Sequence, residues 1–203
     1  MLFPSPLRPA TLLCRYKRFL ADVRFDDGEA TTVHCPNPGA MMGVAPQGAR
    51  CWVSRSPNET RKLPYTLEIV ECENPSGEKV LTGINTHHPN RLAEEAIRQG
   101  LVGALEADGE LLREVRYGEE RSRIDLLQPG RPDTFIEVKN CHLLRRHDRV
   151  AEFPDCVTAR GLKHLRELTR MVEEGHRAML LFVVQRSDAE AVAPAGDLDP
   201  AYA

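Results

Sequence analysis

The sequence predicts an α/β protein whose N-terminal part is all-β. Apolar and polar residues alternate over residues 19–25, which is the period of a half-buried strand. Apolar residues recur with helical spacing over residues 90–99 and 157–174. Residues 178–185 are apolar on both faces, which is typical of a central strand covered by helices on both sides.

The first 82 residues are expected to form a small barrel similar to an OB fold. The expected strands cover residues 11–16, 19–25, 29–35, 50–54, 65–72 and 79–84. Phe19 would begin the core-facing positions of the second strand, and Asp27-Gly28 would turn the chain into the third. A sheet this small needs closure to protect its edges, so we expect a barrel rather than an open sheet.

Residues 83–203 are expected to form an α/β domain with a mixed sheet. Its expected elements are a helix over 90–99, a strand over 111–117, a hairpin of strands 124–127 and 134–139, a helix over 157–174 and a central strand over 178–185. Asn90 is a candidate cap of the first helix, and Gly100 ends it. The residues expected on the apolar face of the second helix are Leu162, Leu165, Leu168 and Val172.

The composition is that of an ordinary globular protein, with 41% hydrophobic and 28% charged residues among 203. No apolar run approaches the roughly 20 residues that span a bilayer, and the start does not read as a signal peptide. We therefore expect a cytoplasmic protein with no membrane partner. Six cysteines occur singly without a C-x-x-C pair, which favours reduced thiols over a zinc site.

Net charge does not indicate a nucleic-acid partner, because it is only -3. The distribution of charge is more informative. Basic residues dominate residues 1–24 and gather over 142–170, whereas residues 171–203 are acidic. The two basic segments predict a phosphate-binding face, with solvated charge as the alternative.

The stretch 121–139 carries the clearest candidate site. Side chains alternate along a strand, so Glu137 and Lys139 share one face, and Asp125 lies beside them if the two strands pair. Two carboxylates suit Mg²⁺ or Mn²⁺, and the lysine would orient a metal-bound water. This pattern resembles the PD-(D/E)xK nuclease-like fold, although Ile124 precedes Asp125 where that pattern has proline. A solvated strand face with an ion pair worth under roughly 1 kcal/mol is the alternative.

Candidate nucleic-acid contacts begin where bases and aromatics interleave, at Arg15, Tyr16, Lys17 and Arg18. This composition is used where phosphates lie in a basic groove and bases stack on rings. Its place in the alternating pattern assigns Phe19 to the core instead. Further candidates for phosphate contacts are Arg123, Arg160 and Lys163. The last two lie one helical turn apart, and a solvated helix surface is their alternative interpretation.

Eight stretches, in one order, resemble the sugar fermentation stimulation protein (SfsA) family. They are residues 15–23, 34–37, 39–41, 90–92, 121–125, 137–139, 153–155 and 160–165. The resemblance implies an OB-like domain joined to a PD-(D/E)xK nuclease-like domain, non-specific DNA binding and a regulatory role in maltose metabolism. By position, Asp125 and Glu137 would be metal ligands and Lys139 the catalytic lysine, with Glu95 a helical carboxylate near the same site.

Three departures from the family pattern concern Pro38, residues 140–142 and the end of the chain. Pro38 stands where the family usually has a small polar residue, and Asn140-Cys141-His142 where small or β-branched residues are more usual. The resemblance also implies a further helix and strand beyond Ala203. We therefore expect this sequence to be incomplete at that end.

Two main hypotheses follow from these observations. The first is a DNA-binding, regulatory protein that contacts phosphates without reading sequence. The second is a Mg²⁺- or Mn²⁺-dependent phosphodiesterase in which Asp125, Glu137 and the Val138 carbonyl hold the ion. A third is a protein that acts only through partner contacts. The sequence leaves open DNA versus RNA, single versus double strands, and whether the chain forms homo-oligomers.

Overall fold

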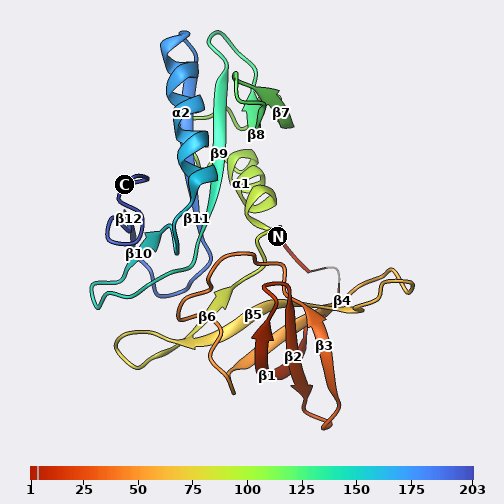
Figure 1. The fold of residues 1–203 in the computed structure, drawn as a ribbon. Helices are drawn as coiled ribbons and strands as arrows, with labels where there is room; N and C mark the ends of the chain where they lie inside the picture. Colours follow the sequence, from red (N-terminus) through yellow and green to blue (C-terminus); the bar gives the residue numbers. More distant parts are fainter. Residues whose placement is uncertain (4) are drawn as a thin grey trace.

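The structure, a computed structural model, describes residues 1–3 and 5–203. Figure 1 shows a barrel of strands below and a second sheet flanked by two helices above. The strands of the lower part are β1 (Arg8–Tyr16), β2 (Leu20–Phe25), β3 (Ala30–His34), β4 (Arg50–Arg55), β5 (Tyr65–Glu73) and β6 (Lys79–Gly83). All of the strands expected over residues 1–82 are present, with ends that differ by a few residues.

The barrel closes because β3 pairs at both edges. The strand order is β3-β2-β1-β4-β5-β6, and β3 also meets β5 through a parallel bridge between His34 and Thr66. Branched side chains such as Leu12, Val23 and Leu67 fill the interior and are fully buried. Alternate positions of a strand point to one face, so the period-2 pattern of the sequence produces this core.

The upper part is an α/β unit with a mixed sheet. Its main elements are α1 (Pro89–Arg98), β7 (Leu112–Tyr117), β8 (Ser122–Gln128), β9 (Thr134–Cys141), α2 (Ala159–Glu173) and β11 (Arg177–Val184). The strand order is β11-β9-β8-β7, in which β11 runs parallel to β9 and the other neighbours are antiparallel. The fold class predicted from the sequence is therefore confirmed.

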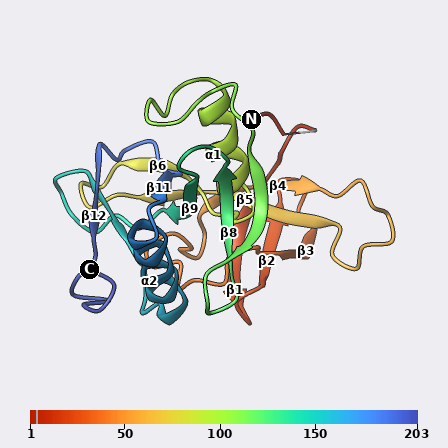
Figure 2. The same cartoon turned by 90° about the horizontal axis from the view of Figure 1, so that it is seen from above.

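The two helices cover opposite faces of this sheet, as the view from above shows (Figure 2). Ile136 and Val138 of β9 pack in the cluster that contains Ala93 of α1. Phe135, which alternates with them, packs in the cluster that contains Leu168 of α2. The face expected to carry Glu137 and Lys139 is therefore the face on the side of α2.

The last long strand does not lie where the sequence predicted it. β11 was expected at the centre of the sheet, but it is the edge strand next to β9, and its interior residues are half-buried. Both faces of β11 are apolar because helices cover both faces of the sheet. An edge strand can be covered in this way as well as a central one. Two short strands were not predicted, β10 (Val150–Phe153) and β12 (Ala191–Pro194), which pair in parallel beside this sheet.

Polar contacts fasten the barrel to the α/β unit. Buried Glu68 of β5 accepts hydrogen bonds from Asn85 Nδ2 at 2.7 Å and His88 Nε2 at 2.8 Å, just before α1. The backbone N–H of Met41, in a barrel loop, donates to Asp155 Oδ2 at 3.0 Å. The domain boundary expected after residue 82 falls inside β6 and stays a prediction.

Two residues assigned to the core lie on the surface instead. Phe19 is 49% exposed because the β1–β2 turn, with positive φ at Lys17 and Arg18, continues until β2 begins at Leu20. Val172 is 53% exposed, because α2 buries Leu168 and Met171 while Val172 lies on another side. All six cysteines are free thiols, four of them buried. None of the helices in the described residues is long and apolar enough to cross a membrane.

Candidate functional site

The site begins where the β8–β9 ladder opens. The last paired residues of β8 and β9 are Leu126 and Ile136. Asp125 is therefore the next residue along β8, and Glu137 is the next along β9. In place of a ladder bond, the backbone N–H of Val138 donates to Asp125 Oδ2 at 2.8 Å. The two acids therefore lie on neighbouring strands at the point where the strands separate.

Helix α1 fixes the second oxygen of Asp125. Asn90 Nδ2 donates to Asp125 Oδ1 at 2.9 Å. The sequence suggested Asn90 as the helix cap, but the N-cap residue is His88 and Pro89 occupies the first turn. Since the Asn90 amide is free of capping, it orients the carboxylate instead.

Glu137 is only 2% exposed and carries two basic neighbours on one oxygen. Lys139 Nζ donates to Glu137 Oε1 at 2.5 Å, and the His164 ring of α2 donates to the same oxygen through Nδ1. Glu137 Oε2 is buried and has no hydrogen-bond partner among the described residues. The carboxylate thus has one neutralised oxygen and one free oxygen.

The surroundings shift the two acids in opposite directions. Burial, followed by the negative charge of Glu137, raises the pKa of Asp125. Burial also opposes ionisation of Glu137, but the hydrogen bond from His164 and the charge of Lys139 outweigh it and lower the pKa of Glu137. Glu137 is therefore held ionised, while Asp125 needs a further positive charge to become equally acidic.

A cavity of about 350 Å³ brings these groups together. Its lining residues are Pro38, Thr86, Pro89, Asn90, Asp125, Glu137, Val138, Lys139, Asn140, Thr158, Arg160, Gly161 and His164. Arg160 adds a second cation beside Lys139, and its Nε lies 3.4 Å from His164 Nε2. Acids, cations and a concave space therefore coincide, as a site for an anionic substrate requires.

The carboxylates fit a hard divalent cation. Within residues 1–3 and 5–203, no group of three or more His, Cys, Asp or Glu side chains has the arrangement of a complete metal cage. Mg²⁺ needs no such cage, because it keeps several waters and uses one or two carboxylates together with substrate phosphate. Asp125 and the orphaned Glu137 Oε2 would hold the ion.

The structure does not bring Glu95 to this cavity. Its Oε1 accepts a hydrogen bond from the Met1 amino group at 2.7 Å. Glu95 lies five positions after Asn90, which turns it to a different side of α1. Asn90 is therefore the α1 residue at the site, and it supplies an amide where a carboxylate was expected.

Two of the predicted nucleic-acid contacts are used within the protein. The Arg15 guanidinium donates to the carbonyls of Asn37 at 2.8 Å and Gly39 at 2.9 Å, and so holds the loop that carries Pro38 to the cavity. The Tyr16 hydroxyl donates to Asp22 Oδ1 at 3.0 Å. Neither side chain is presented freely to a ligand.

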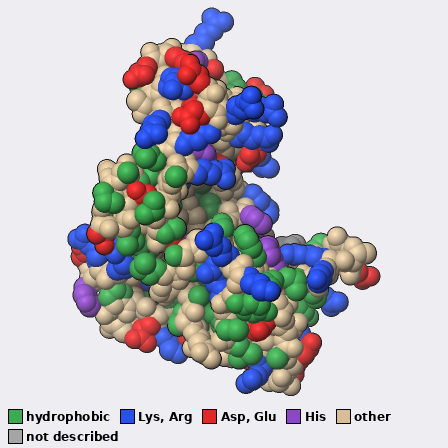
Figure 3. Space-filling model, viewed as in Figure 1, with side chains coloured by type: hydrophobic (Ala, Val, Ile, Leu, Met, Phe, Trp, Pro, Cys, Tyr) green, Lys and Arg blue, Asp and Glu red, His purple; other side chains and the backbone are tan. Residues whose placement is uncertain are grey.

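The other predicted contacts are distributed over three places. Lys17 and Arg18 are exposed on the β1–β2 turn, beside exposed Phe19, and Arg160 lines the cavity. Arg123 lines a separate cleft, and Lys163 Nζ donates to the carbonyl of Glu120. In Figure 3, Lys and Arg side chains lie above and below a recess between the barrel and the upper sheet.

Sequence reasoning missed Asn90 and His164 as site residues. His164 follows Lys163 in a matched stretch, but nothing in the helical pattern gave it a role. The available signal was its spacing: Gly161, His164, Leu168 and Met171 recur at three and four residues and form the buried face of α2. A polar residue on such a face indicates a partner, which here is Glu137.

Comparisons with known proteins identify matching families over most of the chain. The family model described as "SfsA N-terminal OB domain" matches residues 13–81, which agrees with the expected OB-like barrel. The model described as "Sugar fermentation stimulation protein RE domain" matches residues 87–203.

Similar proteins extend along the whole chain. A sugar fermentation stimulation protein homolog of Rhodospirillum centenum is 55% identical over 100% of this chain and 85% of the relative. A homolog of Jannaschia sp. is 52% identical over 100% of this chain and 83% of the relative. The solved structure of Pyrococcus furiosus SfsA in complex with Ca²⁺ aligns with a TM-score of 0.81 at 27% identity, covering 97% of this chain and 80% of that one.

Proposed function

The chain belongs to the sugar fermentation stimulation protein family, and from this premise we propose that it binds nucleic acid and hydrolyses a phosphodiester bond with a divalent cation. The observation that carries the proposal is the convergence of Asp125, Glu137 and Lys139 in one cavity with Arg160. A buried and a half-buried acid beside cations, with shifted pKa values and in a concave space, mark a candidate ligand site.

A divalent cation is supported by two independent observations. Glu137 Oε2 is buried without a partner, and such an oxygen is expensive to leave unsatisfied. The Pyrococcus furiosus relative was solved in complex with Ca²⁺, a cation that takes oxygen ligands. Mg²⁺ or Mn²⁺ in this site would polarise the scissile phosphate and lower the pKa of a bound water.

The protein residues would divide the remaining work. The Asn90 amide and the Val138 N–H hold both oxygens of Asp125 in fixed directions. The Lys139 ammonium would position the attacking water and stabilise the charge that develops on phosphate. The Arg160 guanidinium would bind non-bridging phosphate oxygens in two-point fashion.

Binding would rest mainly on phosphate contacts. Exposed Lys17 and Arg18 and the cavity residue Arg160 are the cations placed for this role. Such contacts are independent of sequence and weaken with salt, because bound counterions are released. DNA is the proposed partner, with strandedness left to the experiment.

A second candidate is a regulatory DNA-binding protein that does not cleave. The observation that favours it is the shared oxygen of Glu137, which already accepts hydrogen bonds from Lys139 and His164. A carboxylate tied in this way binds a cation less readily. This candidate includes a role in sugar fermentation, which the names of the relatives suggest. Maltose is the sugar that we propose.

Cleavage assays separate the two candidates. Single-stranded DNA, duplex DNA and RNA are incubated with Mg²⁺ or Mn²⁺, and wild type is compared with Lys139→Ala. The matched control is Lys62→Ala, because Lys62 is exposed on the β4–β5 connection and has no ion pair among the described residues. Metal-dependent cleavage that only Lys139→Ala abolishes supports the enzyme. Binding without any cleavage supports the regulator. A protein that neither binds nor cleaves these substrates would overturn both candidates.

A further inference from the structure

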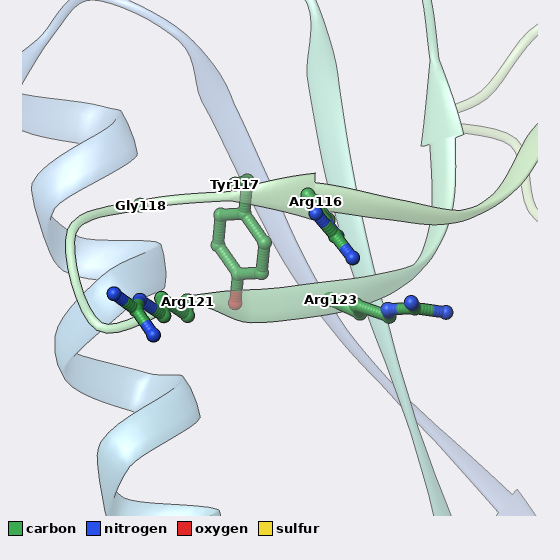
Figure 4. A pocket seen from close by; sticks show the side chains of 5 residues that line it. All are labelled: Arg116, Tyr117, Gly118, Arg121 and Arg123. Carbon is green, nitrogen blue, oxygen red and sulfur yellow. The ribbon is translucent and has the colours of Figure 1, made fainter.

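The β7–β8 hairpin carries a second cleft, of about 520 Å³, that the proposed reaction does not use. It is lined by Arg116, Tyr117, Gly118, Arg121 and Arg123. Arg116 and Arg123 are direct cross-strand partners, and Arg121 lies on the turn between the strands. Figure 4 shows the three arginines spread around Tyr117.

The three guanidinium groups lack internal anions. Among the described residues, none of them forms a salt bridge or a hydrogen bond to a side chain, whereas other arginines such as Arg50 and Arg145 do. Like charges directly opposite in a sheet are destabilising. The pairing of Arg116 with Arg123 therefore costs stability in the free protein and favours an anion between them.

The hairpin turn is held rigidly against α2. The fully buried carboxylate of Glu167 accepts backbone N–H groups of Glu119 at 3.2 Å and Glu120 at 2.9 Å. Arg170 Nη1 lies 3.2 Å from Oε1 of the same carboxylate and neutralises it. Lys163 Nζ donates to the Glu120 carbonyl. The Glu119 carboxylate lies 3.5 Å from Arg170 as well, so Glu119 and Glu167 both have a cation other than the three cleft arginines. The arginines are presented on a backbone that α2 holds in place.

Tyr117 supplies a neutral donor beneath the cleft. Its hydroxyl is buried and has no hydrogen-bond partner among the described residues. Figure 4 shows the hydroxyl directed toward β8, between Arg121 and Arg123. Burial, together with the charges of Glu137, Glu167 and Asp125, raises the pKa of Tyr117 well above its usual range. The group therefore stays protonated and able to donate to an oxyanion.

The cleft and the cavity that holds Asp125 both involve β8. Arg123 precedes Asp125 by two residues on β8, a separation of about 7 Å between Cα atoms along an extended strand. Lys163 at the turn and Arg160 in the cavity lie on the same helix, about one turn apart. A nucleic-acid strand with one phosphate at Lys139 would therefore reach the hairpin within a short distance.

We propose that Arg116, Arg121 and Arg123 form a subsite for the terminal phosphate of a nucleic-acid strand. The subsite rests on the proposed function. A phosphodiester carries one negative charge, whereas a terminal phosphate carries about 1.5 to 2 at neutral pH. Three unpaired guanidinium groups match the doubly charged group better, because each forms charge-assisted hydrogen bonds to its oxygens. The subsite would make the protein select strand ends.

Binding without metal tests the subsite separately from catalysis. Fluorescence anisotropy in EDTA compares one short single-stranded oligonucleotide in three forms: with a 5′-phosphate, with a 3′-phosphate, and with neither. We expect one phosphorylated form to bind about tenfold tighter than the unmodified form, which is the scale of one additional charge-assisted contact. The preferred form then identifies the strand end.

The variants are Arg116→Gln and Arg121→Gln, with Arg131→Gln as control. Arg131 is exposed in the β8–β9 turn, at the other end of β8, and has no salt bridge among the described residues. The first two should reduce the preference to about twofold or less, while the control retains it. Equal binding of all three forms, or a preference that survives both variants, would overturn the subsite alone. Failure to bind any oligonucleotide would overturn the proposed function as well.

Discussion

Asn90 Nδ2 lies 2.9 Å from Asp125 Oδ1, so the first turn of α1 and the middle of β8 meet at one carboxylate. The Val138 N–H takes the other oxygen at 2.8 Å. Together they leave the remaining lone pairs of Asp125 in defined directions. Groups that orient a ligand in this way tune metal affinity without touching the metal.

Asn90→Ala is expected to weaken Mn²⁺ binding by about tenfold or more, since the side chain of Asp125 would lose one of its two fixed partners. Isothermal titration calorimetry measures the affinity. Asn58→Ala is the control, because Asn58 is exposed in the loop after β4 and its side chain, among the described residues, bonds only to Thr60. Unchanged Mn²⁺ affinity in Asn90→Ala would show that Asn90 does not support a metal ligand.

Gly118→Ala is expected to destabilise the protein by at least about 2 kcal/mol. Gly118 has φ of +65°, and a Cβ there would lie 1.5 Å from Glu167 Oε2. Gly28→Ala separates backbone strain from the clash, because Gly28 has φ of +91° and no atom of the described residues lies within 4 Å of its Cβ position. The free energy of unfolding of this control should fall by only about 1 kcal/mol, which is the cost of backbone strain alone. Urea unfolding measures both, and equal losses would contradict the clash with Glu167.

The placement of Asp125, Glu137 and Lys139 on β8 and β9 was predictable, because it depends on the local geometry of two paired strands. Alternation along β9 placed Glu137 and Lys139 on one face, and the short turn of the hairpin brought Asp125 alongside. What the sequence did not reveal was burial. The interpretation as a solvated strand face is wrong for Glu137, which α2 covers.

The helical contributions were harder to predict because they depend on tertiary packing. An apolar stripe was expected to define the buried face of α2, but that face also carries His164 and Glu167, whose partners are Glu137 and the hairpin turn. Polar residues interrupt the hydrophobic periodicity of a helix even when they are buried, so the pattern does not mark them as part of the buried face. On α1, a carboxylate was expected at the site, which favoured Glu95. The residue that contacts Asp125 is Asn90, through its side-chain amide.

The stability of the junction between the two parts should depend on pH through Glu68. Burial opposes its ionisation, but hydrogen bonds from His88, Ser54 and Asn85 outweigh burial and lower the pKa of Glu68. A depressed folded pKa gives stability that is present above the unfolded value of about 4.3 and is lost as the pH falls through the folded value. The free energy of unfolding of wild type should therefore fall as the pH drops below about 4.3 and on through the lowered pKa of Glu68.

Glu68→Gln tests this dependence. The variant should be less stable than wild type at pH 7, and the gap should narrow as the solution is acidified, because the wild-type carboxylate becomes neutral as well. Urea unfolding over this pH range measures the gap. Glu59→Gln, at an exposed loop position, should follow the wild-type curve. A gap that is constant with pH would exclude an ionised Glu68 as the cause.

Arg15 and Arg18 should differ in what they support, although they lie three residues apart. Arg15 satisfies carbonyls of the loop that carries Pro38, so Arg15→Ala should lower the free energy of unfolding by about 2 kcal/mol. Arg18 is exposed, and Arg18→Ala should leave stability unchanged. If Arg18 contacts one phosphate, its loss should reduce the slope of log affinity against log salt by about 1.

The two measurements, made on both variants, distinguish a structural arginine from a binding arginine. Anisotropy titrations of a DNA oligonucleotide at several salt concentrations give the slope, and urea unfolding gives the stability. For Arg15→Ala the slope should equal that of wild type, because its guanidinium is occupied by protein carbonyls before DNA arrives. A reduced slope of log affinity against log salt for Arg15→Ala, with stability retained, would mean that Arg15 leaves the loop to contact phosphate. Arg15 would then count as a DNA-binding residue.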